Sequence, residues 1–149
     1  MSAIYNLHKV SDRLACAGQP REDQLASIAT EGCKVVINLG LADGKYALKD
    51  EAASVTGLGM AYHHIPVLFD RPQAGELSEF ITLMDKHAGD KTFVHCAANY
   101  RASVFTGLYL FSKGKLDEEG LQNFIEEVWQ PNPTWQLFVE ESIAFLKGR

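Results

Sequence analysis

Residues 34–39 (KVVINL) are the strongest constraint on how this chain can fold. The centre of this segment is β-branched and continuously apolar, which is typical of a strand buried on both faces of a sheet. Such a strand needs helices packed on each side of the sheet to which it belongs. The segment therefore predicts an α/β fold.

The remaining segments alternate between strand-like and helix-like patterns. The alternation predicts one domain over residues 1–149, with a mostly parallel sheet flanked by helices and a helical cluster at the C-terminal end. In such a sheet a ligand binds at the carboxyl ends of the strands. The other predicted strands are 14–17, 60–67 and 92–95. Four helices are predicted at 20–32, about 46–56, 77–89 and 101–112. Two more helices follow, one capped by Asp117 and one capped by Asn132 with Pro133 in its first position.

Composition narrows the function further. Fourteen Lys and Arg against nineteen Asp and Glu give a net charge of −5, and no basic stripe is present, so we expect no nucleic-acid partner. No apolar run approaches the roughly 18–20 residues of a membrane span, and the N-terminus lacks the pattern of a secretory signal. The three cysteines have no CxxC spacing, which favours reduced thiols and a cytoplasmic location without membrane association.

Residues 94–103 (VHCAANYRAS) are the segment that carries chemistry. Cys96 follows a predicted strand directly and faces the start of the next predicted helix, where the helix dipole and free backbone N–H groups favour a thiolate and an anion. Arg101 adds a planar fork of donors for two oxygens of a tetrahedral anion. The alternative interpretation is a structural cysteine beside a solvent-facing arginine. Within the loop, Asn99 best tolerates a positive φ.

This arrangement resembles the signature of the cysteine-dependent phosphatase superfamily, tyrosine and dual-specificity, which is His-Cys-x5-Arg followed by Ser or Thr. Residues 35–39 and 64–67 (HIPV) resemble strands of the dual-specificity domain. The sequence is most similar to a small group of bacterial phosphatase-like proteins that share AGQP (17–20), HCAAN (95–99) and PNP (131–133). The resemblance implies a dual-specificity-phosphatase-like fold and hydrolysis of phosphate monoesters, including phosphotyrosine or phosphoserine, through a phosphocysteine on Cys96.

The resemblance also implies roles for individual residues. Cys96 is the nucleophile, Arg101 holds the phosphoryl oxygens, and Asp70 is the general acid on the loop after the HIPV strand. The partner is a phosphorylated small molecule or a phosphoprotein, and phosphate or sulfate can occupy the loop; no cofactor is implied. His63 and His64 face opposite sides of a strand, so no metal site is expected. The phosphate-binding loop is Ala97, Ala98, Asn99, Tyr100 and Arg101, and the supporting residues are His95, Ser103 and Gln19.

One departure from the signature keeps two other functions open. Four residues separate Cys96 from Arg101, where the phosphatase signature has five, and the usual glycine is absent. A six-residue loop from cysteine to arginine is the length found in many rhodanese-like sulfurtransferases, which would carry a persulfide on Cys96. A non-catalytic oxyanion-binding module would keep the loop and Arg101 without turnover.

Overall fold

A computed structural model, described for residues 3–148, contains a five-stranded sheet with the order β1-β2-β5-β3-β4. β1 runs antiparallel to β2, and every other neighbouring pair is parallel. The expectation of a mostly parallel sheet is therefore confirmed. The strands are β1 (His8–Ser11), β2 (Leu14–Ala17), β3 (Val35–Asn38), β4 (Ala61–His64) and β5 (Thr92–His95).

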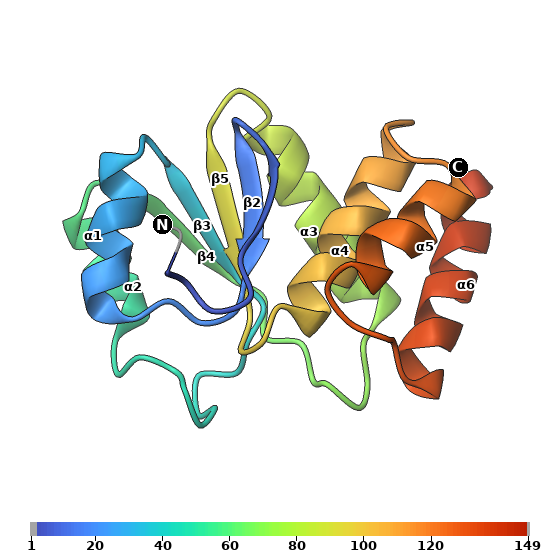
Figure 1. The fold of residues 1–149 in the computed structure, drawn as a ribbon, viewed down its shortest axis with the longest axis horizontal. Coiled ribbons are helices and arrows are strands. Elements are labelled where there is room, and N and C mark those ends of the chain that lie inside the picture. The colour runs from blue at the N-terminus through green and yellow to red at the C-terminus, as the bar shows by residue number, and fades with distance from the viewer. Residues whose placement is uncertain (1–2, 149) are drawn as a thin grey trace.

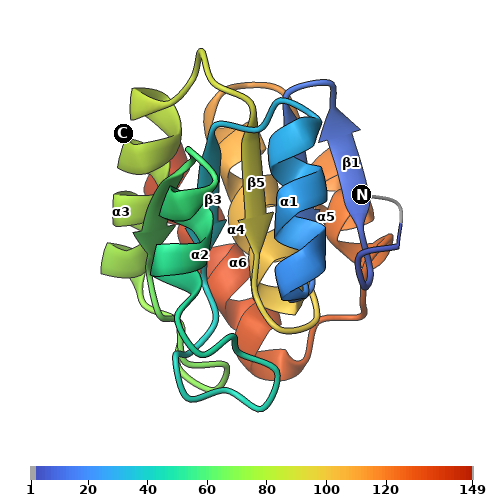
Figure 2. The same cartoon turned by 90° about the vertical axis from the view of Figure 1, so that its left-hand side faces the viewer.

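Helices cover both faces of this sheet, so the molecule has three main layers (Figure 1). On one face lie α1 (Glu22–Thr30) and α2 (Glu51–Gly57), which stand in front of the sheet in Figure 2. On the other face lie α3 (Ala74–Lys86) and α4 (Tyr100–Ser112). The C-terminal cluster expected from the sequence consists of α5 (Glu118–Glu126) and α6 (Pro133–Lys147), which both pack against α4.

Two separate hydrophobic clusters hold the layers together, because successive side chains of a strand point to opposite faces. Ile37 and Val94 face α3 and α4 and pack with Phe105. Val36 and Phe93 point the other way, into the cluster that includes α1. All four residues of β3 are buried, as the β-branched run predicts.

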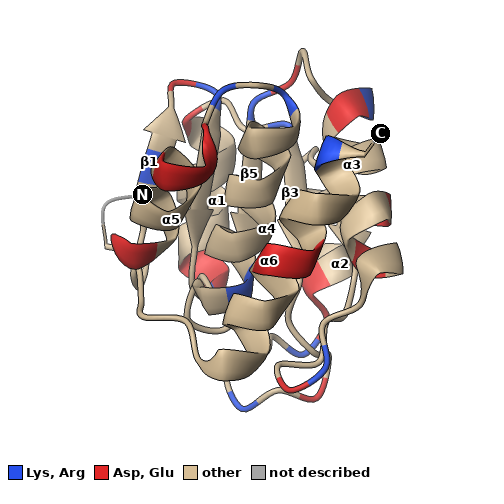
Figure 3. Ribbon diagram, turned by 90° about the vertical axis from the view of Figure 1, so that its right-hand side faces the viewer, with Lys and Arg blue, Asp and Glu red and all other residues tan. Residues whose placement is uncertain are grey.

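The outer helical layer carries many of the acidic residues, as the view from that side shows (Figure 3). These exposed residues belong to α5, α6 and the turn after α5, and they are Glu118, Glu119, Glu126, Glu127, Glu140 and Glu141. No helix among the described residues has both the length and the hydropathy needed to cross a bilayer.

The predicted helix caps are confirmed, whereas one strand was not expected and two boundaries differ from the prediction. Asp117 accepts a hydrogen bond from the N–H of Gly120, and Asn132 accepts one from Trp135. β1 was not expected, because its sequence (HKVS) becomes a strand only by pairing with β2. The other two differences concern α2, which begins at Glu51 rather than near residue 46, and β4, which ends at His64 rather than at residue 67.

Each of the two shifted boundaries has a local cause. The side chain of Asp50 accepts the N–H of Ala53 at 3.2 Å, and this cap fixes the first turn of α2. Beyond β4, Ile65 and Val67 still donate to carbonyls of the β3 segment, but Pro66 has no N–H to give. The chain therefore leaves the sheet gradually at this point.

Trp135 joins the C-terminal cluster to the loop that follows β4, and its replacement tests this link. The indole is fully buried against Phe105 and Phe138, and its Nε1 donates to the carbonyl of Phe69 at 2.6 Å. Trp135→Phe leaves that carbonyl without the indole donor and a void in the core, so we expect unfolding free energy to fall by about 1–3 kcal/mol. Urea denaturation measures this loss.

A matched control lies two residues further along the same helix. The side chain of Leu137 is 55% exposed, so Leu137→Ala should change the unfolding free energy by no more than about 0.5 kcal/mol. Equal stability of the Trp135→Phe protein and the wild type would show that the indole contact does not hold the loop.

Candidate active site

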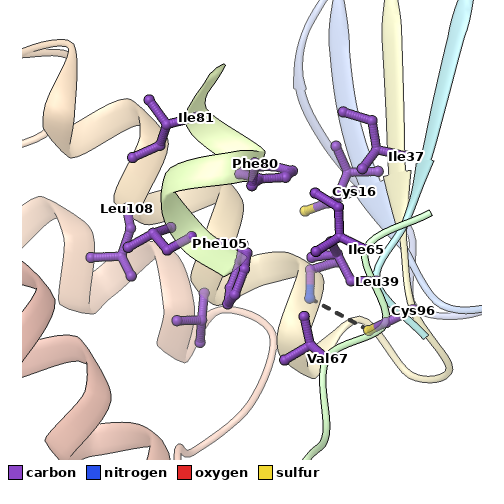
Figure 4. Close-up of a cluster of buried hydrophobic side chains, with 14 of the residues drawn as sticks. Cys16, Ile37, Leu39, Ile65, Val67, Phe80, Ile81, Cys96, Phe105 and Leu108 are labelled. Carbon is purple, nitrogen blue, oxygen red and sulfur yellow. Dashed lines mark hydrogen bonds between the residues drawn. The ribbon is translucent and has the colours of Figure 1, made fainter. Parts of the chain in front are cut away.

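Cys96 lies where β5 ends and the chain turns into α4, at the carboxyl edge of the parallel strands. It is 1% exposed, and its side chain lies among Leu39, Ile65 and Val67 (Figure 4). The backbone N–H of Ala102 donates to the Cys96 Sγ at 3.4 Å. The thiol therefore faces the positive end of α4, an arrangement that stabilises a thiolate.

The loop between Cys96 and α4 has the conformation that the sequence predicts for Asn99. Its φ is 73°, in the left-handed region, which confirms Asn99 as the loop residue with positive φ. Its side-chain Nδ2 donates to the carbonyl of Asn6 at 2.9 Å, and Nδ2 of Asn6 donates to the carbonyl of Ala98 at 2.9 Å. This reciprocal pair ties the loop to the N-terminal segment. The amide N–H groups of Tyr100 and Arg101 donate to no acceptor in the described part of the chain.

Arg101 is nearly buried, at 9% exposed, and has no carboxylate partner among the described residues. Its Nη1 donates to the carbonyl of Val67 at 2.8 Å, and the guanidinium lies 6.0 Å from the ring centre of Phe69. A buried guanidinium without a counter-ion is a strong attractor for an anion. Arg101 and the free N–H groups at the start of α4 therefore make an arrangement beside Cys96 that can bind an oxyanion.

An aromatic cluster fixes the loop that carries Asp70. The ring of Phe69 lies 5.7 Å from Trp129 and 5.9 Å from Trp135 between ring centres. Trp129 in turn stacks on Tyr100 at 4.4 Å with an interplanar angle of 9°. Trp135 is fully buried, while Trp129 is only half-buried. The cluster links the segment after β4 to the start of α4.

Behind the loop lies a buried ion pair that the sequence did not reveal. The Nε2 of His95 is 2.6 Å from Oε2 of Glu51, and both side chains are at least 95% buried. The other ring nitrogen of His95 lies 3.2 Å from the carbonyl of Cys96. Burial alone would raise the pKa of Glu51, but the hydrogen bond and charge of His95, with a hydrogen bond from Gln19, lower that pKa below its ordinary value.

Two close backbone approaches complete the frame of the loop. Gln19 donates its backbone N–H to the carbonyl of Ala97 at 3.0 Å and its side-chain Nε2 to Oε1 of Glu51 at 2.8 Å. Gly18 lies so close that a Cβ atom there would stand 2.7 Å from the Ala97 carbonyl oxygen. Gly40 also lies next to Cys96: a Cβ atom added to Gly40 would stand 3.7 Å from the Cα of Cys96.

The structure brings together most of the residues singled out in the sequence. Cys96, His95, Gln19, Arg101 and the loop residues meet at one edge of the sheet. Asp70 is exposed, three residues beyond the Val67 carbonyl that holds Arg101, and forms no hydrogen bond or ion pair with the rest of residues 3–148. Ser103 donates its hydroxyl to the carbonyl of Tyr100 at 2.9 Å, and the N–H that reaches Cys96 is that of Ala102 instead.

Three contributors to the site escaped sequence reasoning: Asn6, Glu51 and Phe69. Glu51 falls in the middle of the helix expected at 46–56, so its place behind the loop was hidden. The available signal for the start of α2 was the sequence Asp50-Glu51, which is typical of a helix cap followed by a carboxylate in the first turn. No group of three or more His, Cys, Asp or Glu residues within 3–148 could hold a metal ion.

A cavity of about 600 Å³ opens on one flank of the loop. Its wall includes Ala97 and Ala98 but neither Cys96 nor Arg101, so it adjoins the oxyanion site and does not contain it. Tyr5 and Tyr46, both largely exposed, stand at its border. The remaining lining residues are Gln19, Pro20, Arg21, Glu22 and Leu48.

Two glycine substitutions of opposite effect test the close approach at residue 18. Gly18→Ala places a methyl group against backbone, so we expect unfolding free energy to fall by about 1–3 kcal/mol. Gly75→Ala, in the first turn of α3 with nothing within 4 Å, should instead raise it by about 0.4–1 kcal/mol. Thermal unfolding compares the two variants, and a neutral Gly18→Ala protein would contradict the packing described here.

Known proteins resemble both the sequence and the fold. No protein-family model matches the chain. The "Beta-lactamase hydrolase-like protein" of Xylella fastidiosa (strain Temecula1) is 25% identical over 116 residues, which are 76% of this chain. The protein of the same name from Agrobacterium fabrum (strain C58) is 26% identical over 119 residues, or 78% of this chain. The chain spans 27% of the length of each of these curated relatives.

Several crystal structures share the whole fold. TpbA of P. aeruginosa in complex with pTyr has a TM-score of 0.68 at 16% identity, covering 81% of this chain and 72% of that one. PTPMT1 in complex with PI(5)P has a TM-score of 0.80 at 14% identity, covering 96% and 97%. A "Putative phosphatase (DUF442)" from Shewanella putrefaciens CN-32 has a TM-score of 0.89 at 34% identity, covering 97% of this chain and 95% of that chain. The chain shares its fold with TpbA and PTPMT1 and belongs to the DUF442 family.

Proposed function

We infer that this protein hydrolyses phosphate monoesters through a phosphocysteine on Cys96. The observation that carries the proposal is the nearly buried guanidinium of Arg101, which has no carboxylate partner among residues 3–148 and stands at the start of α4. It supplies positive charge next to a thiol that already accepts an N–H from the same helix. Membership of a phosphatase-like family supports the same chemistry.

The reaction follows from these positions in two balanced steps. The Cys96 thiolate attacks phosphorus, so that an S–P bond forms while the P–O ester bond breaks, and the departing oxygen takes the proton of Asp70. Water then attacks the phosphocysteine, the S–P bond breaks, inorganic phosphate leaves, and the proton from water goes to the Asp70 carboxylate. Arg101 and the loop N–H groups hold the equatorial oxygens throughout.

The position of Asp70 supports its role as the general acid. Its loop is anchored on the N-terminal side of the residue: the Val67 carbonyl binds Arg101, and the Phe69 carbonyl binds Trp135. An exposed carboxyl on a loop fixed in this way can approach the leaving oxygen of a bound ester. The aromatic contacts of Phe69 keep that loop next to the oxyanion site.

The cavity beside the loop would receive the organic part of the substrate. Its volume of about 600 Å³ is sufficient for a small organic group. Proteins of the same fold have been solved with pTyr and with PI(5)P, which supports a phosphorylated small molecule or a phosphorylated side chain as the substrate.

Loop length favours a second candidate function, sulfur transfer. With four residues between Cys96 and Arg101 the ring is smaller than in the phosphatase signature. In this reaction the Cys96 thiolate attacks the outer sulfur of thiosulfate, an S–S bond forms, and sulfite leaves. An acceptor thiol then takes the sulfur from the persulfide.

Parallel assays of p-nitrophenyl phosphate and thiosulfate separate these functions. We expect the wild type to hydrolyse the phosphate ester, and Cys96→Ser to lower that rate by at least about 1,000-fold because the nucleophile is lost. Cys33→Ser, a buried cysteine on the other face of the sheet, is the matched control and should keep the activity. Turnover of thiosulfate alone would establish sulfur transfer, and turnover of neither would leave an oxyanion-binding module.

The contribution of Arg101 can be measured without turnover. Arg101→Lys replaces a two-pronged donor with a point charge, so we expect vanadate or phosphate to bind roughly tenfold or more weakly. Arg13→Lys is the control, because Arg13 binds the Gly89 carbonyl near the opposite end of the strands. Isothermal titration calorimetry gives both affinities. Equal binding by the Arg101→Lys protein would mean that the loop N–H groups alone hold the anion.

A further inference from the structure

Glu51 is a buried carboxylate directly behind the catalytic loop, and the proposed reaction does not use it. Its side chain is 5% exposed, although it belongs to the first residue of α2. Its two oxygens contact two different segments: Oε2 lies 2.6 Å from His95 Nε2, and Oε1 accepts from Gln19 Nε2 at 2.8 Å. A carboxylate at this depth is stable only when it is paired and hydrogen-bonded, so these contacts define its role.

The contacts of His95 determine how many protons its ring carries. One ring nitrogen faces the Glu51 carboxylate and the other faces the carbonyl of Cys96 at 3.2 Å, and both neighbours are acceptors. A neutral imidazole has a single N–H and can satisfy only one of them. The lowered pKa of Glu51 keeps that carboxyl ionised, so it cannot donate in its place. For the ring to donate to both acceptors, each of its nitrogens must carry a proton.

This pair reaches the loop by two routes. Through His95, Glu51 directs an N–H at the carbonyl of Cys96. Through Gln19, it holds the turn whose backbone N–H binds the carbonyl of Ala97 at 3.0 Å. Both carbonyls are thereby turned away from the oxyanion site, which leaves the N–H groups of the following residues directed toward it.

We propose that Glu51 is a positioning residue for Cys96, acting through His95: it keeps the ring positively charged behind the loop and so favours the thiolate. His95 is the residue next to Cys96 in the chain, and the Glu51 carboxylate lies beyond the His95 ring. The Cys96 thiolate therefore interacts more strongly with the positive ring than with the negative carboxylate. The inference rests on the proposed function only in that Cys96 is the nucleophile.

The other titratable groups near this pair do not supply the same charge. Tyr62, on β4, has its pKa raised to about 12, because burial and then the charges of Glu51 and Asp50 outweigh its hydrogen bond with Asn38, so it stays neutral. His64, also on β4, donates Nε2–H to the carbonyl of Gly40 at 2.6 Å and acts on Glu51 only through its charge. Among residues 3–148, no other element places an ionisable side chain in contact with His95.

The test is the pH dependence of Cys96 alkylation in the Glu51→Gln protein. Gln is isosteric with Glu but uncharged, so His95 loses its counter-ion and becomes neutral. We expect the half-maximal rate with iodoacetamide to move to higher pH, and the rate near pH 6 to fall about tenfold, the equivalent of one pH unit. Peptide mass spectrometry assigns the label to Cys96. Burial raises the pKa of Cys16 to about 12 and also raises that of Cys33, which keeps both slow to react.

Two comparisons separate positioning from general destabilisation. Glu118→Gln removes a first-turn helix carboxylate from an exposed ion pair with Lys147, and it should leave the alkylation profile unchanged. In a His95→Asn background, Glu51→Gln should add less than twofold, because its effect passes through the missing ring. An unchanged profile in folded Glu51→Gln protein, or additive effects in the double variant, would overturn the inference.

A measurement on the wild type covers the case in which Glu51→Gln does not fold. Nitrogen-15 NMR of the His95 ring at neutral pH should show both nitrogens protonated, and a neutral ring would overturn the inference. Phosphate-ester assays of the same proteins distinguish the two proposals. Absent hydrolysis with a shifted alkylation profile rejects the proposed function alone, whereas normal hydrolysis with an unshifted profile rejects the role of Glu51 alone.

Discussion

The left-handed backbone conformation of Asn99 is the constraint on which the site depends. Only four residues lie between Cys96 and Arg101, and within them the chain must change from a strand to a helix. A residue at a φ of 73° makes that reversal in one step. Asn tolerates this conformation, and here its amide also binds the carbonyl of Asn6, which offsets the strain. From that single turn follow the direction of α4, the N–H group on the Cys96 sulfur and the place of Arg101.

Two buried basic side chains at the loop have different surroundings. His95 contacts the Glu51 carboxylate with one ring nitrogen and the carbonyl of Cys96 with the other. The charge on Arg101 has no carboxylate partner within residues 3–148 and is held only by a carbonyl and an aromatic ring, so it remains available to a ligand. The contact between Glu51 and His95 stabilises the frame of the loop, whereas the guanidinium of Arg101 remains available to bind an anion.

Much of the architecture could be predicted from local pattern. The β-branched run of β3, the caps at Asp117 and Asn132, and the positive φ of Asn99 depend on neighbours within a few residues, so the sequence contains the information directly. The failures have different causes. β1 is a strand because β2 lies beside it, so its residues have no distinctive local signal. α2 starts at Glu51 because Asp50 caps it, which is a local signal, whereas the contacts of Glu51 with Gln19 and His95 depend on distant segments.

The sequence by itself determined which residues are candidates for the chemistry and where they stand in the chain. A cysteine at the end of a buried strand and an arginine at the start of the next helix must meet at the carboxyl edge of a parallel sheet, because strand and helix geometry leaves them no other place. Only the tertiary structure decided what surrounds them. Asn6, Gln19, Glu51 and Phe69 come from four separate parts of the chain, and their contacts with the loop exist only once the layers pack. Packing is the physical reason: it is a property of the assembled fold, and it brings side chains from distant segments into the hydrogen bonds and ring contacts that surround the loop.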